Sequence, residues 1–148
     1  MIRWGEFARV EPELAAFGAG RLGVPPAYLA TVRQSGAPRV HPVTPIVTAH
    51  GLFLFMEPTS PKGRDLRERG WYALHNGVPD TDGSGGEFFV SGKGFAVEDA
   101  AVRAIVAQAA SYEPDERYVL FELKLSEARC NGYGDVPLPD RRRWSAPS

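Results

Sequence analysis

Cysteine is nearly absent from this sequence of 148 residues, which holds only Cys130. A lone thiol excludes an intramolecular disulfide and a metal site built from several thiolates, and we expect an inert side chain. An excess of either charge is missing too: 17 Lys and Arg stand against 18 Asp and Glu, for a formal net charge of -1. Because nucleic-acid-binding surfaces are strongly basic, we expect no nucleic acid as a partner.

Long apolar runs are also missing. No stretch of the sequence approaches the ~20 apolar residues that a transmembrane helix needs, and the first seven residues lack the apolar stretch of a signal peptide. We therefore expect a cytoplasmic protein without a membrane partner. The length suits one domain over residues 1–148, with the ordinary composition of a globular protein: 43% hydrophobic and 24% charged residues.

Helices are predicted in three places. Apolar residues recur at helical spacing over residues 4–22, where Pro12 should divide the segment into two short helices. Further helices are expected over residues 60–70 and over residues 100–110, and Asp99 can cap the latter.

Strands are predicted next to these helices. Three strand-like runs, at residues 28–33, 39–48 and 52–56, are separated by turn sequences at 35–38 and 49–51. Tight turns between strands predict an antiparallel meander.

The second and third of these runs carry further information. Pro42 and Pro45 remove two backbone donors, so the second run must be bulged or lie at a sheet edge. The run 52–56 is apolar on both faces. We therefore expect one face on a barrel core and the other on a partner.

Later strands complete the expected sheet. They lie at 71–75, 87–97 and 118–125, and Gly92 and Gly94 inside the second predict a bulge or a barrel corner. Six strands with few helices predict a mainly β (α+β) fold, a six-stranded antiparallel barrel with helices at its edges.

Two segments resist such an assignment. Residues 76–86 form a Gly-rich loop that we expect to be mobile, and Ser84 within it lacks the flanking residues of a nucleophile motif. The run Arg141–Arg143 before Trp144 allows three interpretations: a solvated tail, a contact with a cofactor of a second subunit, or a weak nucleic-acid contact.

The start of the helix predicted over residues 60–70 carries the clearest evidence of a binding site. Ser60 suits the N-cap and Pro61 the first helical position, and Lys62 follows. A helix N-terminus attracts phosphate through its free N–H groups and partial positive charge. Arg39 would join Ser60 and Lys62 in a phosphate pocket if the second and third strands pair. The alternative is that Ser60 only caps the helix, with Lys62 and Arg64 on a solvated face.

Five stretches carry a family resemblance, in this order along the chain: residues 27–31, 36–43, 51–56, 60–66 and 92–97. Together they resemble the pyridoxamine 5'-phosphate oxidase-like split-barrel family, whose members bind flavins. The resemblance implies a split β-barrel that forms a homodimer, with two flavin sites at the subunit interface.

The resemblance also implies which residues contact the cofactor. By position, Arg39 and Lys62 would hold the flavin phosphate, with Ser60 close by. The isoalloxazine ring would be lined by Val40, His41, Pro42, Val43 and Thr44. The ribityl chain would lie along Phe55 and Met56.

The chain departs from the authentic oxidase at two basic positions. Pro61 stands where the oxidase has a second basic residue on the short helix, and Thr44 stands where it has a lysine. These departures argue against pyridoxamine phosphate as the substrate. The chain looks more like shorter family members, some of which use FMN and some the deazaflavin F420.

A flavin performs the hydride chemistry itself, so such an enzyme needs no conspicuous acid–base pair. We expect an FMN-dependent oxidoreductase acting on a small organic substrate. The alternatives are an F420-dependent reductase or a non-catalytic module that binds flavin or haem. His41 would contact ring or substrate, or else be a hydrogen-bonded strand histidine. No histidines show metal-binding spacing, so no metal site is expected.

Overall fold

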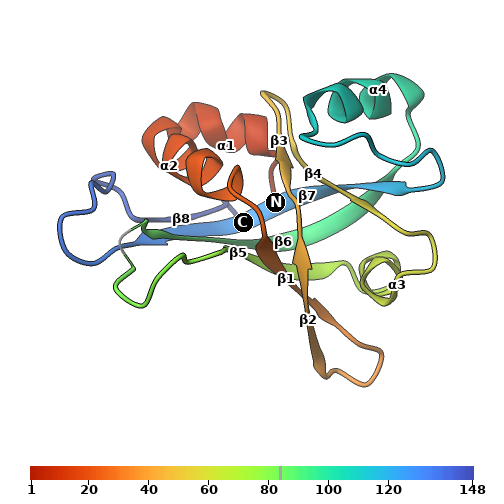
Figure 1. Cartoon of the computed structure of the whole chain (residues 1–148), viewed down its shortest axis with the longest axis horizontal. Helices are drawn as coiled ribbons and strands as arrows, with labels where there is room; N and C mark the ends of the chain where they lie inside the picture. Colours follow the sequence, from red (N-terminus) through yellow and green to blue (C-terminus); the bar gives the residue numbers. More distant parts are fainter. Residues whose placement is uncertain (84) are drawn as a thin grey trace.

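The chain folds into a curled antiparallel sheet flanked by helices, so the expected mainly β (α+β) fold is confirmed (Figure 1). The structure is a computed structural model that describes residues 1–83 and 85–148. Ser84, whose role as a nucleophile the sequence argued against, lies outside the described residues.

The helices are α1 (Trp4–Val10), α2 (Pro12–Leu22), α3 (Pro61–Glu68) and α4 (Ala100–Ala109). The strands are β1 (Ala27–Val32), β2 (Pro38–Val43), β3 (Ile46–Val47), β4 (Leu52–Met56), β5 (Trp71–Asn76), β6 (Glu87–Val97), β7 (Val119–Asn131) and β8 (Arg143–Ser145).

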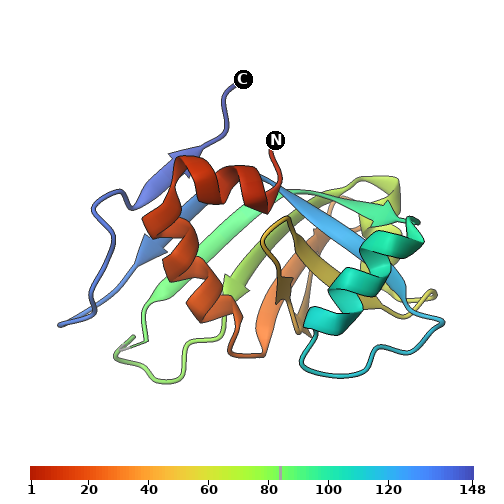
Figure 2. The ribbon, with the colours of Figure 1, turned by 90° about the horizontal axis from the view of Figure 1, so that it is seen from above.

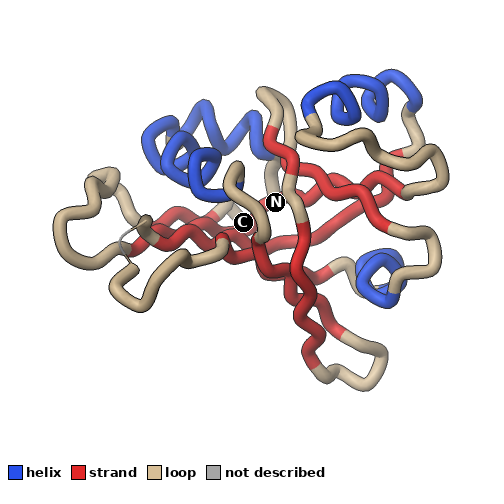
Figure 3. Tube along the Cα trace, in the orientation of Figure 1, coloured by secondary structure: helices blue, strands red, loops and turns tan. Residues whose placement is uncertain are grey.

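The order of the strands explains why the sheet curls. It runs β2-β1-β5-β6-β7-β4-β3, with β8 paired to β7 outside this path. The strands β2 and β3 therefore lie at opposite ends of the order, yet only Thr44 and Pro45 separate them along the chain. Both ends must come together, and Figure 3 shows the two edge strands meeting in one continuous path. The result is a half-barrel.

Helices α1 and α2 cover one face of this sheet, as the view from above shows (Figure 2). Their aromatic residues form the densest part of the core: the Trp4 ring lies 5.3 Å from that of Phe7 and 5.9 Å from that of Phe88. The Phe7 ring in turn lies 5.0 Å from that of Trp144. All four side chains are buried.

The interpretation of the C-terminal arginine run as a solvated tail holds in part: Arg141, Arg142 and Arg143 are exposed, but Trp144 after them is buried. Arg143–Ser145 form strand β8, and Ala128 of β7 is the register partner of Trp144. The buried Trp144 side chain thus holds strand β8, which begins at Arg143, against β7.

The number of strands differs from the six expected. The predicted strand 39–48 is two strands, because the chain leaves β2 at Thr44 and Pro45 before it pairs again as β3. β8 is the other addition. The edge position predicted for the strand with Pro42 is confirmed, since β2 ends the sheet order. A register shift between Ser91 and Gly92 confirms the predicted bulge.

The second apolar face of β4 is covered by this chain itself. Leu52, Leu54 and Met56 belong to the main core. Phe53, on the other face, packs in a second cluster with Ile46, Leu120 and Val106 of α4. The helix therefore takes the place for which the sequence predicted a partner.

None of the helices in the described part of the chain is long and apolar enough to cross a membrane.

Candidate functional site

The start of α3 is built as the sequence predicts. The Ser60 hydroxyl accepts a hydrogen bond from the backbone N–H of Gly63, at 3.2 Å, and Pro61 occupies the first turn. Because proline has no N–H and Gly63 is already capped, this helix presents fewer free donors than most. Among the described residues, no acceptor faces the backbone N–H of Lys62.

Arg39 reaches this helix by a route different from the expected one. β2 pairs with β1 and not with β4, so Arg39 lies opposite Thr31. The expected pairing of the second and third predicted strands is found at residues 46–47, which form β3 and pair with β4, but not at Arg39, which lies in the part that pairs with β1. What joins Arg39 to α3 is Asp65: the Arg39 Nε donates to its Oδ2 at 2.9 Å, and the Thr31 hydroxyl donates to the same oxygen at 2.7 Å.

Asp65 is the residue that sequence reasoning missed. Its relative exposure is 3%, and its other oxygen, Oδ1, accepts from Nη2 of Arg69 at 3.1 Å. Burial alone would raise the pKa of Asp65, but hydrogen bonds from Thr31, Arg39 and Arg69 and the Arg39 charge outweigh it, so the pKa lies below its usual value. The carboxylate therefore stays ionised and orients both guanidinium groups.

The pKa values of Lys62 and His41 are both lowered, for partly different reasons. Burial lowers the pKa of Lys62, more than the nearby carboxylate of Glu57 raises it. Burial also lowers the pKa of His41, and the charges of Lys62 and Arg39 lower it further. Both cations thus lie within electrostatic reach of one imidazole. Among the described residues, no carboxylate forms an ion pair with Lys62, whereas Glu57 pairs with Arg117.

The remaining predicted residues divide into two groups. The Ser60 hydroxyl lies 3.9 Å from the sulfur of Met56, which ties the end of β4 to the helix start. Phe55 points the other way: it packs with the cluster around α4, and the Arg103 guanidinium lies 5.0 Å from its ring. The structure therefore does not bring the Phe55 side chain together with Arg39 and Lys62.

The β2 residues expected along the ring form an open edge. Val40, His41 and Pro42 are exposed, and Val43 and Thr44 are half-buried. As the last strand of the order, β2 has one side without a strand partner. Its unpaired backbone groups are available to a ligand.

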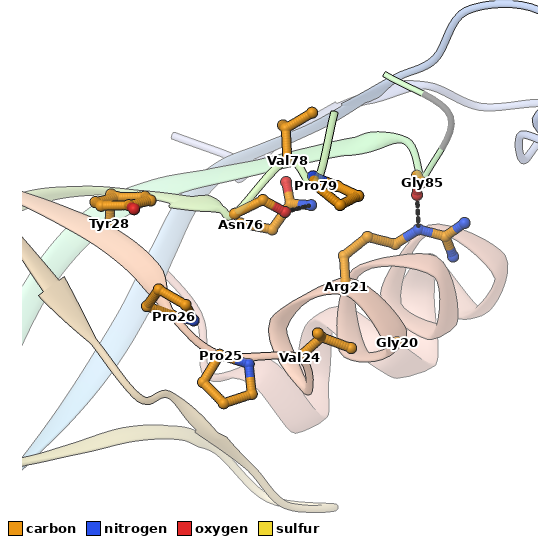
Figure 4. A pocket seen from close by; sticks show the side chains of 11 residues that line it. Gly20, Arg21, Val24, Pro25, Pro26, Tyr28, Asn76, Val78, Pro79 and Gly85 are labelled. Carbon is orange, nitrogen blue, oxygen red and sulfur yellow. Dashed lines mark hydrogen bonds between the residues drawn. The ribbon is translucent and has the colours of Figure 1, made fainter. Parts of the chain in front are cut away.

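A cavity of about 440 Å³ opens at the far end of β1, between the end of α2 and the loop that follows β5 (Figure 4). Tyr28, which lies in the cavity wall, is the register partner of Pro42 in β2. Arg21 is the charged residue of the wall; its Nε donates to the carbonyl of Gly85 at 2.8 Å, and its guanidinium lies 3.7 Å from the Phe17 ring. Most other wall residues are apolar: Val24, Pro25, Pro26, Val78 and Pro79.

Comparison with protein-family models and with curated protein sequences found no match. Among solved structures, the chain is similar to a conserved hypothetical protein from Mycobacterium tuberculosis, with 18% identity and a TM-score of 0.72, over 88% of this chain and 89% of that one. It is also similar to a heme binding protein from Mycobacterium smegmatis (19%, TM-score 0.68), covering 90% of this chain and 56% of that one. The chain thus spans little more than half of that protein.

An F420 reductase is a third similar structure, at 20% identity and a TM-score of 0.57, over 74% of this chain and 94% of that one. At such identities, similarity establishes the fold alone. The chain shares the fold of these structures, a curled antiparallel half-barrel with flanking helices, which is consistent with the split barrel that the sequence resemblance implies.

Replacing Asp65 by Asn should destabilise the protein by about 2 kcal/mol at pH 7, because the half-buried Arg39 guanidinium loses its counter-charge and Arg69 keeps only its pair with Glu68. The folded-state pKa of Asp65 is lowered, so its stabilisation is complete above the unfolded value of about 4 and is lost as the pH falls through the folded value. Urea unfolding of parent and Asp65→Asn at pH 7 and in acid measures this. The gap between the two proteins should narrow in acid.

The matched control is Thr31→Val, which removes one hydrogen bond to the same carboxylate and no charge. Its cost should change less with pH than that of Asp65→Asn. An equal gap for Asp65→Asn at both pH values would contradict the assigned role of the ionised carboxylate.

Proposed function

We propose that the chain binds a flavin nucleotide, FMN before F420, and uses it as an oxidoreductase acting on a small organic molecule. The observation that carries the proposal is the pair of cations at the start of α3. Asp65 holds Arg39 beside the helix, and Lys62 is partly desolvated with no carboxylate partner among the described residues. A desolvated, unpaired ammonium is costly unless an anion occupies the site.

The donor set fits a phosphate. Arg39 and Lys62 would supply charge and the backbone N–H of Lys62 a hydrogen bond, with the Ser60 cap fixing the start of the helix. Along β2, the open backbone edge from Val40 to Thr44 would hydrogen-bond the polar rim of the isoalloxazine ring. Met56 would contact the ribityl chain with its side chain, and Phe55 would contact it through its backbone.

The apolar cavity beside Tyr28 lies where the far end of such a cofactor would point. Arg39 and Pro42 are three residues apart on β2, a rise of about 10 Å, and Pro42 is the partner of Tyr28. When bound, the flavin supplies the hydride transfer. The residues of the chain hold the ring, exclude water and accept a small, mainly apolar substrate in the cavity.

F420 is the second candidate cofactor, and one feature favours it. Because Pro61 and Thr44 replace two basic residues of the oxidase, only Arg39 and Lys62 of the proposed site residues would carry positive charge toward the cofactor phosphate. The phosphate of F420 is a diester with one negative charge, whereas that of FMN is a monoester with up to two. The similarity to an F420 reductase supports the same choice.

We further propose that the chain is a homodimer with the cofactor at the subunit interface. The sheet face opposite α1 and α2 carries large apolar side chains that remain exposed: Val40 at 65%, Trp71 at 52% and Tyr28 at 45%. The strand register places the three on the same face of β2, β5 and β1. An apolar patch of this kind is typical of an interface.

Titration of the apo-protein with FMN, F420 and haem, followed by absorbance and fluorescence, tests the cofactor. We expect saturable binding of a flavin.

Lys62→Gln should weaken FMN binding by about ten- to a hundred-fold, the effect of losing one charged contact to phosphate. Its stability should change little, because Lys62 lies outside the Asp65 network. Arg64→Gln, on an exposed position of the same helix, is the control. Haem binding alone, or equal FMN affinity in both variants, would reject the proposal.

Filling the cavity from Gly20 tests its role as the substrate site. A side chain at Gly20 of α2 meets open space, so Gly20→Phe should enter the cavity without a clash and Gly20→Ala should only stabilise the helix. The readout is reoxidation of reduced, FMN-loaded protein by menadione, a flat apolar acceptor, without oxygen. Gly20→Phe should slow it about ten- to a hundred-fold at unchanged FMN affinity. Equal rates in both variants would place the substrate elsewhere.

Light scattering tests the homodimer. The parent protein should show twice the chain mass of 16.2 kDa, and Trp71→Glu should halve that value, since a charge in an apolar interface is left unpaired. Val10→Glu, at an exposed position on α1, is the matched control and should remain a dimer. A monomeric parent protein would overturn this part of the proposal.

A further inference from the structure

A second cavity, of about 480 Å³, lies where β5, β6 and β7 meet the C-terminal segment. It is polar, in contrast to the cavity beside Tyr28. Three arginines line it, and two of them, Arg142 and Arg143, belong to the C-terminal arginine run that the flavin site leaves unexplained. Its wall consists of His75, Glu87, Phe89, Arg129, Cys130, Asn131, Arg142 and Arg143.

The strand pairing forces like charges together in this wall. Arg143 of β8 lies directly opposite Arg129 of β7. Like charges directly opposite in a sheet are destabilising, and burial of Trp144 beside Arg143 leaves β8 little freedom to separate them. Among the described residues, no carboxylate forms an ion pair with Arg129, Arg142 or Arg143.

Other contacts fix the donors in place. The Arg129 guanidinium lies 4.5 Å from the centre of the Phe89 ring, on which it stacks. The backbone carbonyl of Arg142 accepts a hydrogen bond from the N–H of Cys130 at 2.9 Å. Nδ1 of His75 donates to the carbonyl of Asn76 at 2.7 Å, which leaves its Nε2 for the cavity.

The acidic content of the wall is small. Glu87 is its single carboxylate, and Nδ2 of Asn131 donates to this group at 3.4 Å. Three guanidinium groups therefore outnumber one carboxylate. The site lacks negative charge, and a bound anion would supply it.

We propose that Arg129, Arg142 and Arg143 form a binding site for a small ligand with two or more anionic oxygen groups, phosphate or carboxylate. Guanidinium groups bind such oxygens through paired hydrogen bonds. The cavity volume of about 480 Å³ suits a compact molecule. The net charge of the chain, -1, does not suit a long polyanion such as nucleic acid. The site is separate from the flavin phosphate site, because Arg39 and Arg129 lie on strands separated by β1, β5 and β6.

Calorimetric titration with inorganic pyrophosphate tests the site, in a Lys62→Gln background that weakens binding at the flavin phosphate site. In this background we expect saturable binding that weakens as ionic strength rises. Adding Arg143→Gln should weaken it about ten-fold or more, whereas adding Arg9→Gln, at an exposed position on α1, should leave it unchanged. Adding Glu87→Gln should strengthen it, since the one opposing charge is gone.

Thermal unfolding gives a second, independent measurement. Without ligand, Arg143→Gln should raise the melting temperature, because it relieves the repulsion across β7 and β8, while Arg9→Gln should not. The inference fails if pyrophosphate does not saturate, or if the Arg143 and Arg9 variants bind it equally. It fails as well if a ten-nucleotide DNA strand binds more tightly than pyrophosphate. FMN affinity, measured on Arg143→Gln with Lys62 intact, should stay at the parent value, so failure here leaves the flavin proposal standing.

Discussion

One carboxylate joins the two parts of the molecule that make the candidate flavin site. Asp65 accepts hydrogen bonds from Thr31 of β1, Arg39 of β2 and Arg69 after α3. Through it, a side chain of the edge strand is held directly against the helix. Because the acceptor is buried and ionised, the geometry of Arg39 is fixed before any ligand arrives, which lowers the entropy that binding must overcome.

The sheet curls into a half-barrel because the connection between its two edge strands is short. Two residues, Thr44 and Pro45, lead from one end of the strand order to the other. The sheet must therefore curl around its core, and the aromatic cluster of Trp4, Phe7 and Phe88 fills the concave side. Helix α4 closes the second apolar face of β4. The outer face of β1, β2 and β5, next to the open edge of β2, keeps large apolar side chains exposed.

Local sequence signals predicted much of this architecture. The Ser60 cap, the bulge beside Gly92 and the edge position of the strand with Pro42 each rest on a rule about one or two residues. The pairing of β2 with β1 and the contact between Arg39 and Asp65 join residues far apart in the chain. No local pattern specifies such contacts. An aspartate among charged neighbours on a short helix has the same pattern as a solvent-exposed residue, so its burial was not predictable. The burial of Trp144 was missed for the same reason.

The prolines of β2 have a consequence for how the protein behaves among its own copies. A sheet edge with free backbone groups is a template on which a strand of another molecule can pair, the first step of aggregation. Pro38 and Pro42 supply no N–H, so an incoming strand finds an incomplete ladder there. A compact ligand needs only a few of the remaining groups. The edge thus discourages polymerisation while it stays accessible to a small molecule.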